Sequence, residues 1–151
     1  MAISSAAQKI LDAAIQHFAD KGFDAGSLKT IAESAGIKKA TIYSHFKNKD
    51  ELFLQSFKEA IETESAFVDT CFDSDNIAGE NYLINVSSRY QESDCLKLLL
   101  RASFIPPAEL RTQVQSGYGS FLERIIIRFR EGLPDQIELE ENVCINAYLG
   151  I

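Results

Sequence analysis

The sequence has few of the residues from which covalent cross-links and metal sites are built. Its 151 residues include three cysteines, Cys71, Cys95 and Cys144, which lie far apart without a Cys-x-x-Cys pair. Its two histidines, His17 and His45, form no cluster with them. Dispersed cysteines in odd number argue against structural disulfides and favour a reducing cytosol. We therefore expect no metal, no cofactor and a cytoplasmic location.

Long apolar runs and catalytic motifs are also missing. The runs at residues 98–100 and 125–127 are cut by Arg101 and Arg128, so no membrane-spanning segment is predicted. Asp12 and Asp20 fall within the first twenty residues, which is not typical of a signal peptide. The sequence offers no nucleophile–base pair and no phosphate-binding glycine loop. We therefore expect neither a membrane protein nor an enzyme.

Only three prolines interrupt the chain, and apolar residues recur at helical spacing over most of it. This pattern predicts an all-α protein. The first helix should end at Gly22, a left-handed cap residue. Predicted helices cover about residues 5–21, 28–35, 39–45, 49–70, 82–92, 93–103, 107–132 and 138–151.

The segment from Ser27 onward predicts a helix-turn-helix at about residues 28–47. Ser27 is a good N-cap for its first helix, and Gly36 makes the turn. Ala32 allows a close helix crossing, and Ile42 fits between the two helices as a β-branched wedge. Asn48, with a glutamate three residues later, then starts the next helix.

Charge is distributed unevenly around this motif. The net charge is −7, yet residues 1–60 hold 8 lysines against 7 acidic residues, which gives +1. Residues 61–151 hold 7 basic against 15 acidic residues, which gives −8. No acidic residue occurs from Ile37 to Lys49, so the tip of the motif is basic and suits nucleic-acid phosphates. A solvated lysine face is the alternative interpretation on charge alone.

The stretch IAESAGIKKATIYSHFKNKDELF resembles the DNA-binding head of the TetR family of bacterial transcription regulators. The resemblance implies a homeodomain-like three-helix head at residues 1–50, and a helical-bundle domain for ligand binding and dimerisation at residues 51–151. A helix at about 49–70 would be shared by both. Lys38 stands where the family usually has a Ser or Thr N-cap. Because family members generally continue for two further helices, we expect the bundle to be incomplete at its C-terminus.

The resemblance also implies a ligand-responsive repressor that binds a double-stranded operator as a homodimer. The helix from Lys39 to His45 would enter the major groove, with its N-terminal residues near base edges. Three of the predicted contacts also have a structural explanation: Tyr43 as a core tyrosine, Thr41 as a solvated residue, and His45 as a cation at a helix end. The predicted DNA-binding residues are Ser27, Lys29, Lys38, Lys39, Ala40, Thr41, Tyr43, His45 and Lys49.

The C-terminal bundle holds apolar residues that can either line a cavity for an unknown small-molecule effector or form an ordinary core, which the sequence favours. An alternative function is a helical adaptor that uses the head for protein contacts. The candidate ligand-binding residues are Phe67, Tyr82, Cys95, Leu99, Phe104, Tyr118, Phe121 and Ile125.

Overall fold

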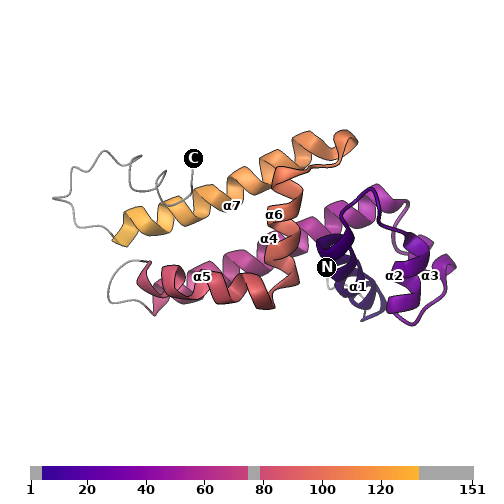
Figure 1. The fold of residues 1–151 in the computed structure, drawn as a ribbon, viewed down its shortest axis with the longest axis horizontal. Helices are drawn as coiled ribbons and strands as arrows, with labels where there is room; N and C mark the ends of the chain where they lie inside the picture. Colours follow the sequence, from indigo (N-terminus) through magenta and orange to yellow (C-terminus); the bar gives the residue numbers. More distant parts are fainter. Residues whose placement is uncertain (1–4, 75–78, 133–151) are drawn as a thin grey trace.

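The computed structural model describes residues 5–74 and 79–132, and within these ranges it contains helices and no strand (Figure 1). The all-α prediction is confirmed. The predicted helix at 138–151 lies outside the described residues. The elements are α1 (Ser5–Lys21), α2 (Leu28–Ser34), α3 (Lys39–Tyr43), α4 (Lys49–Asp73), α5 (Glu80–Glu92), α6 (Asp94–Phe104), the 3-10 helix η1 (Ala108–Leu110) and α7 (Arg111–Gly132).

We call α1–α3 the head and α5–α7 the body, and α4 runs between them (Figure 1). The helix α1 buries an apolar stripe and ends where the sequence predicts, because Gly22 takes a φ of +76°. The Gly22 N–H donates to the Phe18 carbonyl at 2.9 Å, which closes the last turn. Phe18 is fully buried and packs against Phe53 of α4, with ring centroids 5.2 Å apart.

The helix α3 is shorter than predicted, ending at Tyr43 instead of His45. The reason is tertiary: Phe46 turns into the core, where it is 7% exposed. The Phe46 N–H still donates to the Ile42 carbonyl at 2.9 Å, so the chain leaves the helix in a tight turn. Ser44 also donates its hydroxyl to the Thr41 carbonyl at 2.7 Å.

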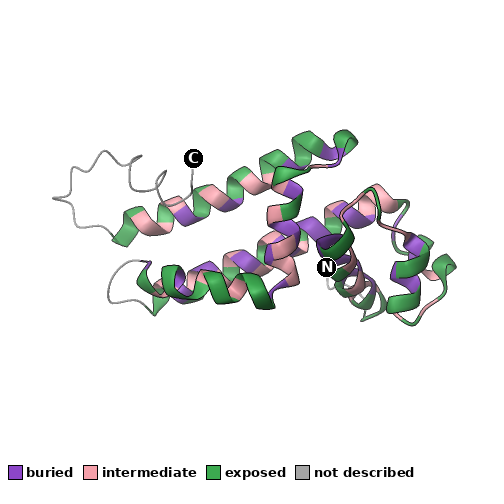
Figure 2. Cartoon of the chain, viewed as in Figure 1, coloured by how far each residue is buried: buried purple, intermediate pink, exposed green. Residues whose placement is uncertain are grey.

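The helix α4 starts at the predicted cap, where the Asn48 side chain accepts from the Glu51 N–H at 2.8 Å. It continues to Asp73, three residues past the predicted end, because buried Val68 and Cys71 extend its apolar stripe. Buried residues gather where α4 meets α1 and α6 (Figure 2). Because α1 and α6 both pack against α4, this region connects the head with the body.

The helix α7 begins later than predicted, at Arg111, because the residues after Pro107 form η1 first. It runs unbroken through Gly117, which allows close packing on α4. A Cβ atom at Gly117 would lie 3.0 Å from both Ile61 Cδ1 and Phe57 Cε1. Among the described residues, no helix is long and apolar enough to cross a membrane.

Candidate nucleic-acid interface

The turn between α2 and α3 fixes the angle at which α3 leaves the head. Gly36 adopts a φ of +68°, a backbone conformation that favours glycine. The Ile37 N–H then donates to the Ala32 carbonyl at 2.9 Å. Ala32 is 2% exposed and Ile42 is fully buried, so one face of α3 is held against α2 and the core. This leaves the opposite face of α3 directed outward.

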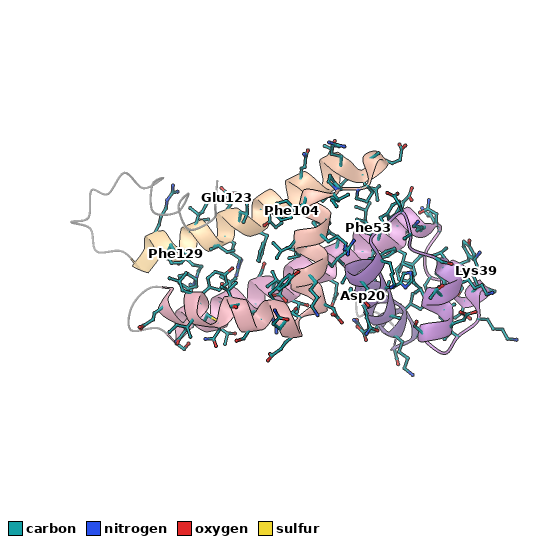
Figure 3. The ribbon with its side chains drawn as sticks, in the orientation of Figure 1. Asp20, Lys39, Phe53, Phe104, Glu123 and Phe129 are labelled. Carbon is teal, nitrogen blue, oxygen red and sulfur yellow. The ribbon has the colours of Figure 1, made fainter. Side chains whose placement is uncertain are left out.

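That outer face carries the predicted base-contacting residues. Lys39 and Ala40 are exposed, and Thr41 is half-buried. Lys39 points away from the body at the far end of the head (Figure 3). Its Nζ atom lies 5.8 Å from the centroid of the Tyr43 ring, and Tyr43 is 51% exposed. The structure therefore excludes the core interpretation of Tyr43 and brings the two side chains together on one surface.

Lysines at both ends of α3 form what we call the basic tip, defined as Lys38, Lys39 and Lys47. All three side chains are exposed, and within the described part of the chain none of their ammonium groups forms a salt bridge. Lys47 contacts the Glu51 carboxylate only through its backbone N–H. Lys38 occupies the N-cap position in an extended conformation, and its side chain makes no capping hydrogen bond. A cation at this end of a helix opposes the helix dipole. An anion bound there would interact favourably with both the Lys38 side chain and the helix dipole.

The start of α2 differs from the prediction in one respect. Ser27 occupies the N-cap position, but its side chain makes no capping hydrogen bond. Instead, the Ser27 N–H donates to Nε2 of His17 at 3.2 Å. The Ser27 hydroxyl therefore has no capping role that would compete with an external contact. Lys29, the second residue of the helix, is exposed and lies 3.9 Å from Glu33, which is a weak surface pair.

His17 must be neutral to accept that hydrogen bond. Its pKa is lowered from the ordinary value of 6.5 by burial and by the nearby Lys21, while Asp20 opposes the shift and Lys49 adds to it. The lowered pKa of His17 keeps the bond between α1 and the start of α2 intact at neutral pH.

Lys49 is held against the α1–α2 connection. Its Nζ atom lies 4.3 Å from the centroid of the Phe23 ring and 3.4 Å from the Asp24 carbonyl oxygen. His45 is exposed in the turn after α3, and its ring lies 6.4 Å from that of Phe46. Lys49 thus has internal interactions to exchange for a phosphate, as Lys29 has its pair with Glu33.

Comparisons with known proteins agree with this geometry. The family described as "Bacterial regulatory proteins, tetR family" matches residues 10–55, which include α1, α2, α3 and the start of α4. Residues 10–55 thus carry the DNA-binding head of the TetR family. The chain is therefore a DNA-binding transcriptional regulator, and the helix-turn-helix is its DNA-binding element.

Relatives and solved structures extend the similarity beyond the head. IcaR of Staphylococcus epidermidis, a negative transcriptional regulator of the biofilm operon icaADBC, is 29% identical over 93% of this chain and 77% of its own length. IcaR of Staphylococcus aureus strain Newman is 48% identical over 50 residues, which are 33% of this chain and 27% of that protein. FadR from Bacillus subtilis, solved in complex with stearoyl-CoA, has a TM-score of 0.71 at 21% identity, covering 95% of this chain and 81% of that one.

The body of this chain separates the predicted ligand-lining residues into groups. Phe67 of α4 and Tyr82 of α5 lie together, with ring centroids 6.3 Å apart. Tyr118 and Phe121 are neighbours on α7, at 6.2 Å. Phe104 belongs to neither group, because it is the last residue of α6 and its side chain is 82% exposed. Its prediction as an interior lining residue is wrong.

The remaining predicted lining residues are internal. Leu99 and Ile125 are buried, and Cys95 is half-buried. Burial, followed by the negative charge of Glu64, raises the pKa of the Cys95 thiol, so the thiol stays protonated. Burial likewise raises the pKa of the Tyr118 hydroxyl.

A buried ion pair in the body was not predicted from the sequence. Glu64 is 1% exposed, and it accepts from Arg89 Nη2 at 2.9 Å and Nε at 3.1 Å and from the Ser93 hydroxyl at 2.6 Å. The signal was present: Glu64 is four residues from both Ala60 and Val68, on the apolar stripe of α4. An acidic residue on an apolar stripe requires a partner.

Proposed function

We propose that this regulator represses transcription by binding operator DNA as a homodimer, with residues 39–45 of each copy in a major groove. The observation that carries the proposal is the outer face of α3, which is basic, exposed and held at a fixed angle by Gly36 and Ile42. Repression is supported by the two IcaR relatives, which are negative transcriptional regulators. We further propose that the protein acts in the cytoplasm, where chromosomal DNA is accessible.

Within this proposal, base edges are contacted from the start of α3. Lys39 can donate to guanine O6 and N7, Thr41 can donate, accept or touch a thymine methyl, and Ala40 permits close approach. Residues 1–60 contain no arginine, so a bidentate arginine–guanine contact from this part of the chain is not available. Sequence discrimination should therefore be moderate and depend partly on DNA shape.

Phosphates are contacted around this helix. Lys38 lies at its N-terminus, Tyr43 and His45 at its C-terminal end, and Ser27 and Lys29 at the start of α2. These contacts would fix the register of the head on the duplex without reading sequence. Lys49 would join them after leaving the Asp24 carbonyl.

The effector should bind in the body and be a small molecule. FadR from Bacillus subtilis, which shares the fold, is solved in complex with stearoyl-CoA. In this chain, residues 51–151 would hold the effector and the dimer contact, and residues 1–50 the DNA contact. Buried aromatic and aliphatic side chains such as Tyr82, Leu99, Phe121 and Ile125 supply apolar surface that suits an apolar ligand.

The experiment begins with selection of bound DNA from a random duplex pool by the whole chain. Affinity for the selected duplex is then measured against salt concentration. With about four cationic contacts in each head and two heads, the log–log slope should be roughly −7. Lys39→Ala should relax base preference, whereas Lys38→Ala should weaken all sequences alike.

Lys58→Ala is the matched control, because Lys58 is an exposed lysine on α4 that pairs with Glu62 instead of facing outward from α3. It should keep both the affinity and the slope. Failure to select any duplex at low salt, together with a stable protein partner in pull-downs, would support the adaptor function instead.

A further inference from the structure

One arginine of the body bonds directly to the backbone of the head. Arg101, near the end of α6, donates from Nε to the Ala19 carbonyl at 2.9 Å and from Nη2 to the Asp20 carbonyl at 3.1 Å. These two acceptors belong to the last turn of α1. The contact therefore joins residues that are 82 positions apart in the sequence.

The chemistry of a helix end explains why a guanidinium fits there. The last carbonyls of a helix have no partner within it and carry partial negative charge. In α1 the Phe18 carbonyl accepts from the Gly22 N–H, whereas the Ala19 and Asp20 carbonyls accept from Arg101. Arg101 thus caps the C-terminus of α1 with a charge of the favourable sign and with two donors in the rigid geometry of one side chain.

The backbone at this point leaves room for the guanidinium. A Cβ atom on Gly22 would lie 3.3 Å from Arg101 Nη1, closer than ordinary van der Waals contact. Gly22 therefore serves two needs at once, a left-handed backbone and space for the arginine.

The hydrogen bonds add direction to an otherwise apolar contact. Leu98 and Ala102, on either side of Arg101 along α6, are 1% and 3% exposed where α6 packs beside α1 and α4. Apolar contacts favour burial without fixing rotation, whereas hydrogen bonds weaken steeply as their angle changes. Asp20 lies beside the crossing of α1 and α6 (Figure 3). The paired bonds therefore restrict how the head can turn against α6.

We propose that Arg101 is a positioning residue that sets the angle between the head and the body, and thereby the half-site spacing that the dimer accepts. This inference rests on the proposed function, because it requires two heads on one operator. A dimer reads half-site separation only if its heads are held at a fixed orientation. Removing the Arg101 bonds should loosen that orientation while leaving α3 intact.

The test uses whole-chain protein and a series of duplexes in which two selected half-sites are moved apart one base pair at a time. Wild-type protein should prefer one spacing by at least about tenfold, and Arg101→Met should reduce that preference to about threefold or less. Arg101→Lys, which keeps the charge and one flexible donor, should give an intermediate preference. Arg111→Met is the matched control and should give the wild-type profile, since Arg111 is exposed at the start of α7.

A purely structural role for Arg101 predicts a different result. Arg101→Met would then bind every spacing more weakly by the same factor and keep the wild-type profile, which would overturn the inference while leaving the proposed function standing. Thermal unfolding identifies any variant that does not fold. If Arg101→Met does not fold, Arg101→Lys decides, and a wild-type profile for it would overturn the inference. If wild-type protein selects no DNA, the proposed function and this inference both fail.

Discussion

The head and the body are joined to α4 by different kinds of interaction. Aromatic packing joins the head to α4, with Phe53 of α4 5.2 Å from Phe18 and 5.1 Å from Phe23 between ring centroids. In the body, ion pairs connect α4 to its neighbours. These pairs join Glu64 to Arg89, Asp69 to Arg124, and Asp73 to Arg128.

The contrast explains how an acidic protein presents a basic surface. Positions 61–151 hold seven basic against 15 acidic residues, and three of the arginines bond to carboxylates of α4. The side chains of the basic-tip lysines form no salt bridge among the described residues. Side-chain cations without internal partners remain available for an external anion such as the DNA backbone.

The largest effect should come from removing the aromatic contact that stabilises the head. Phe53 is 1% exposed, so Phe53→Ala should lower the free energy of unfolding by about 4 kcal/mol through lost burial and an unfilled cavity. Urea unfolding at fixed protein concentration measures the change. Phe104→Ala, at the exposed end of α6, should change stability by less than about 0.5 kcal/mol. Equal losses for both variants would contradict the burial argument.

A smaller loss should follow when the buried ion pair of the body is broken. Arg89→Met leaves the Glu64 carboxylate buried with one neutral donor, Ser93, and should cost about 3 kcal/mol in the same unfolding measurement. Adding Glu64→Leu to Arg89→Met should restore most of this loss, because the uncompensated charge is then gone. If the double variant is less stable than Arg89→Met alone, the pair is not the source of the effect.

A third prediction concerns the bond between His17 and the start of α2. His17→Ala should cost about 1 kcal/mol at neutral pH, since the Ser27 N–H loses its acceptor. Because the pKa of His17 is lower in the folded state, the unfolded state binds more protons as the pH falls through 6.5. Wild-type stability should therefore decline as the pH is lowered through this value.

The His17→Ala variant tests this assignment by its pH dependence. Its decline below pH 6.5 should be shallower than that of the wild-type protein, so the stability difference between the two should narrow on acidification. A difference that is constant with pH would show that protonation of His17 does not contribute.

The smallest effect on stability should come from the basic tip, where the expected change is in DNA binding. Lys39→Ala should alter the free energy of unfolding by less than about 0.5 kcal/mol, because the side chain is exposed. The salt slope of DNA binding by the dimer should become less negative by about 2, one cation from each head. An unchanged slope would show that the Lys39 ammonium does not neutralise a phosphate in the complex.

Much of the head could be predicted from the sequence, because its signals are local. The bounds of α1, the left-handed Gly22 and Gly36, and the Asn48 cap all depend on residues within about one helical turn. The end of α3 was predicted two residues late, since it depends on burial of Phe46 in a core built by other helices. Phe104 was misplaced for a related reason: its apolar character does not show whether another helix lies opposite it.

The sequence by itself determined that the chain is helical, where most helices begin, and that its positive charge is concentrated around one short helix. Only the tertiary structure decided which charges are used internally: Glu64 meets Arg89 across 25 positions, and Arg101 meets the end of α1 across 82. The physical reason is the separation along the chain over which each kind of interaction acts. Helix caps and periodicity act within a few residues of the chain, whereas hydrogen bonds and ion pairs depend on distances that exist only after the helices have packed.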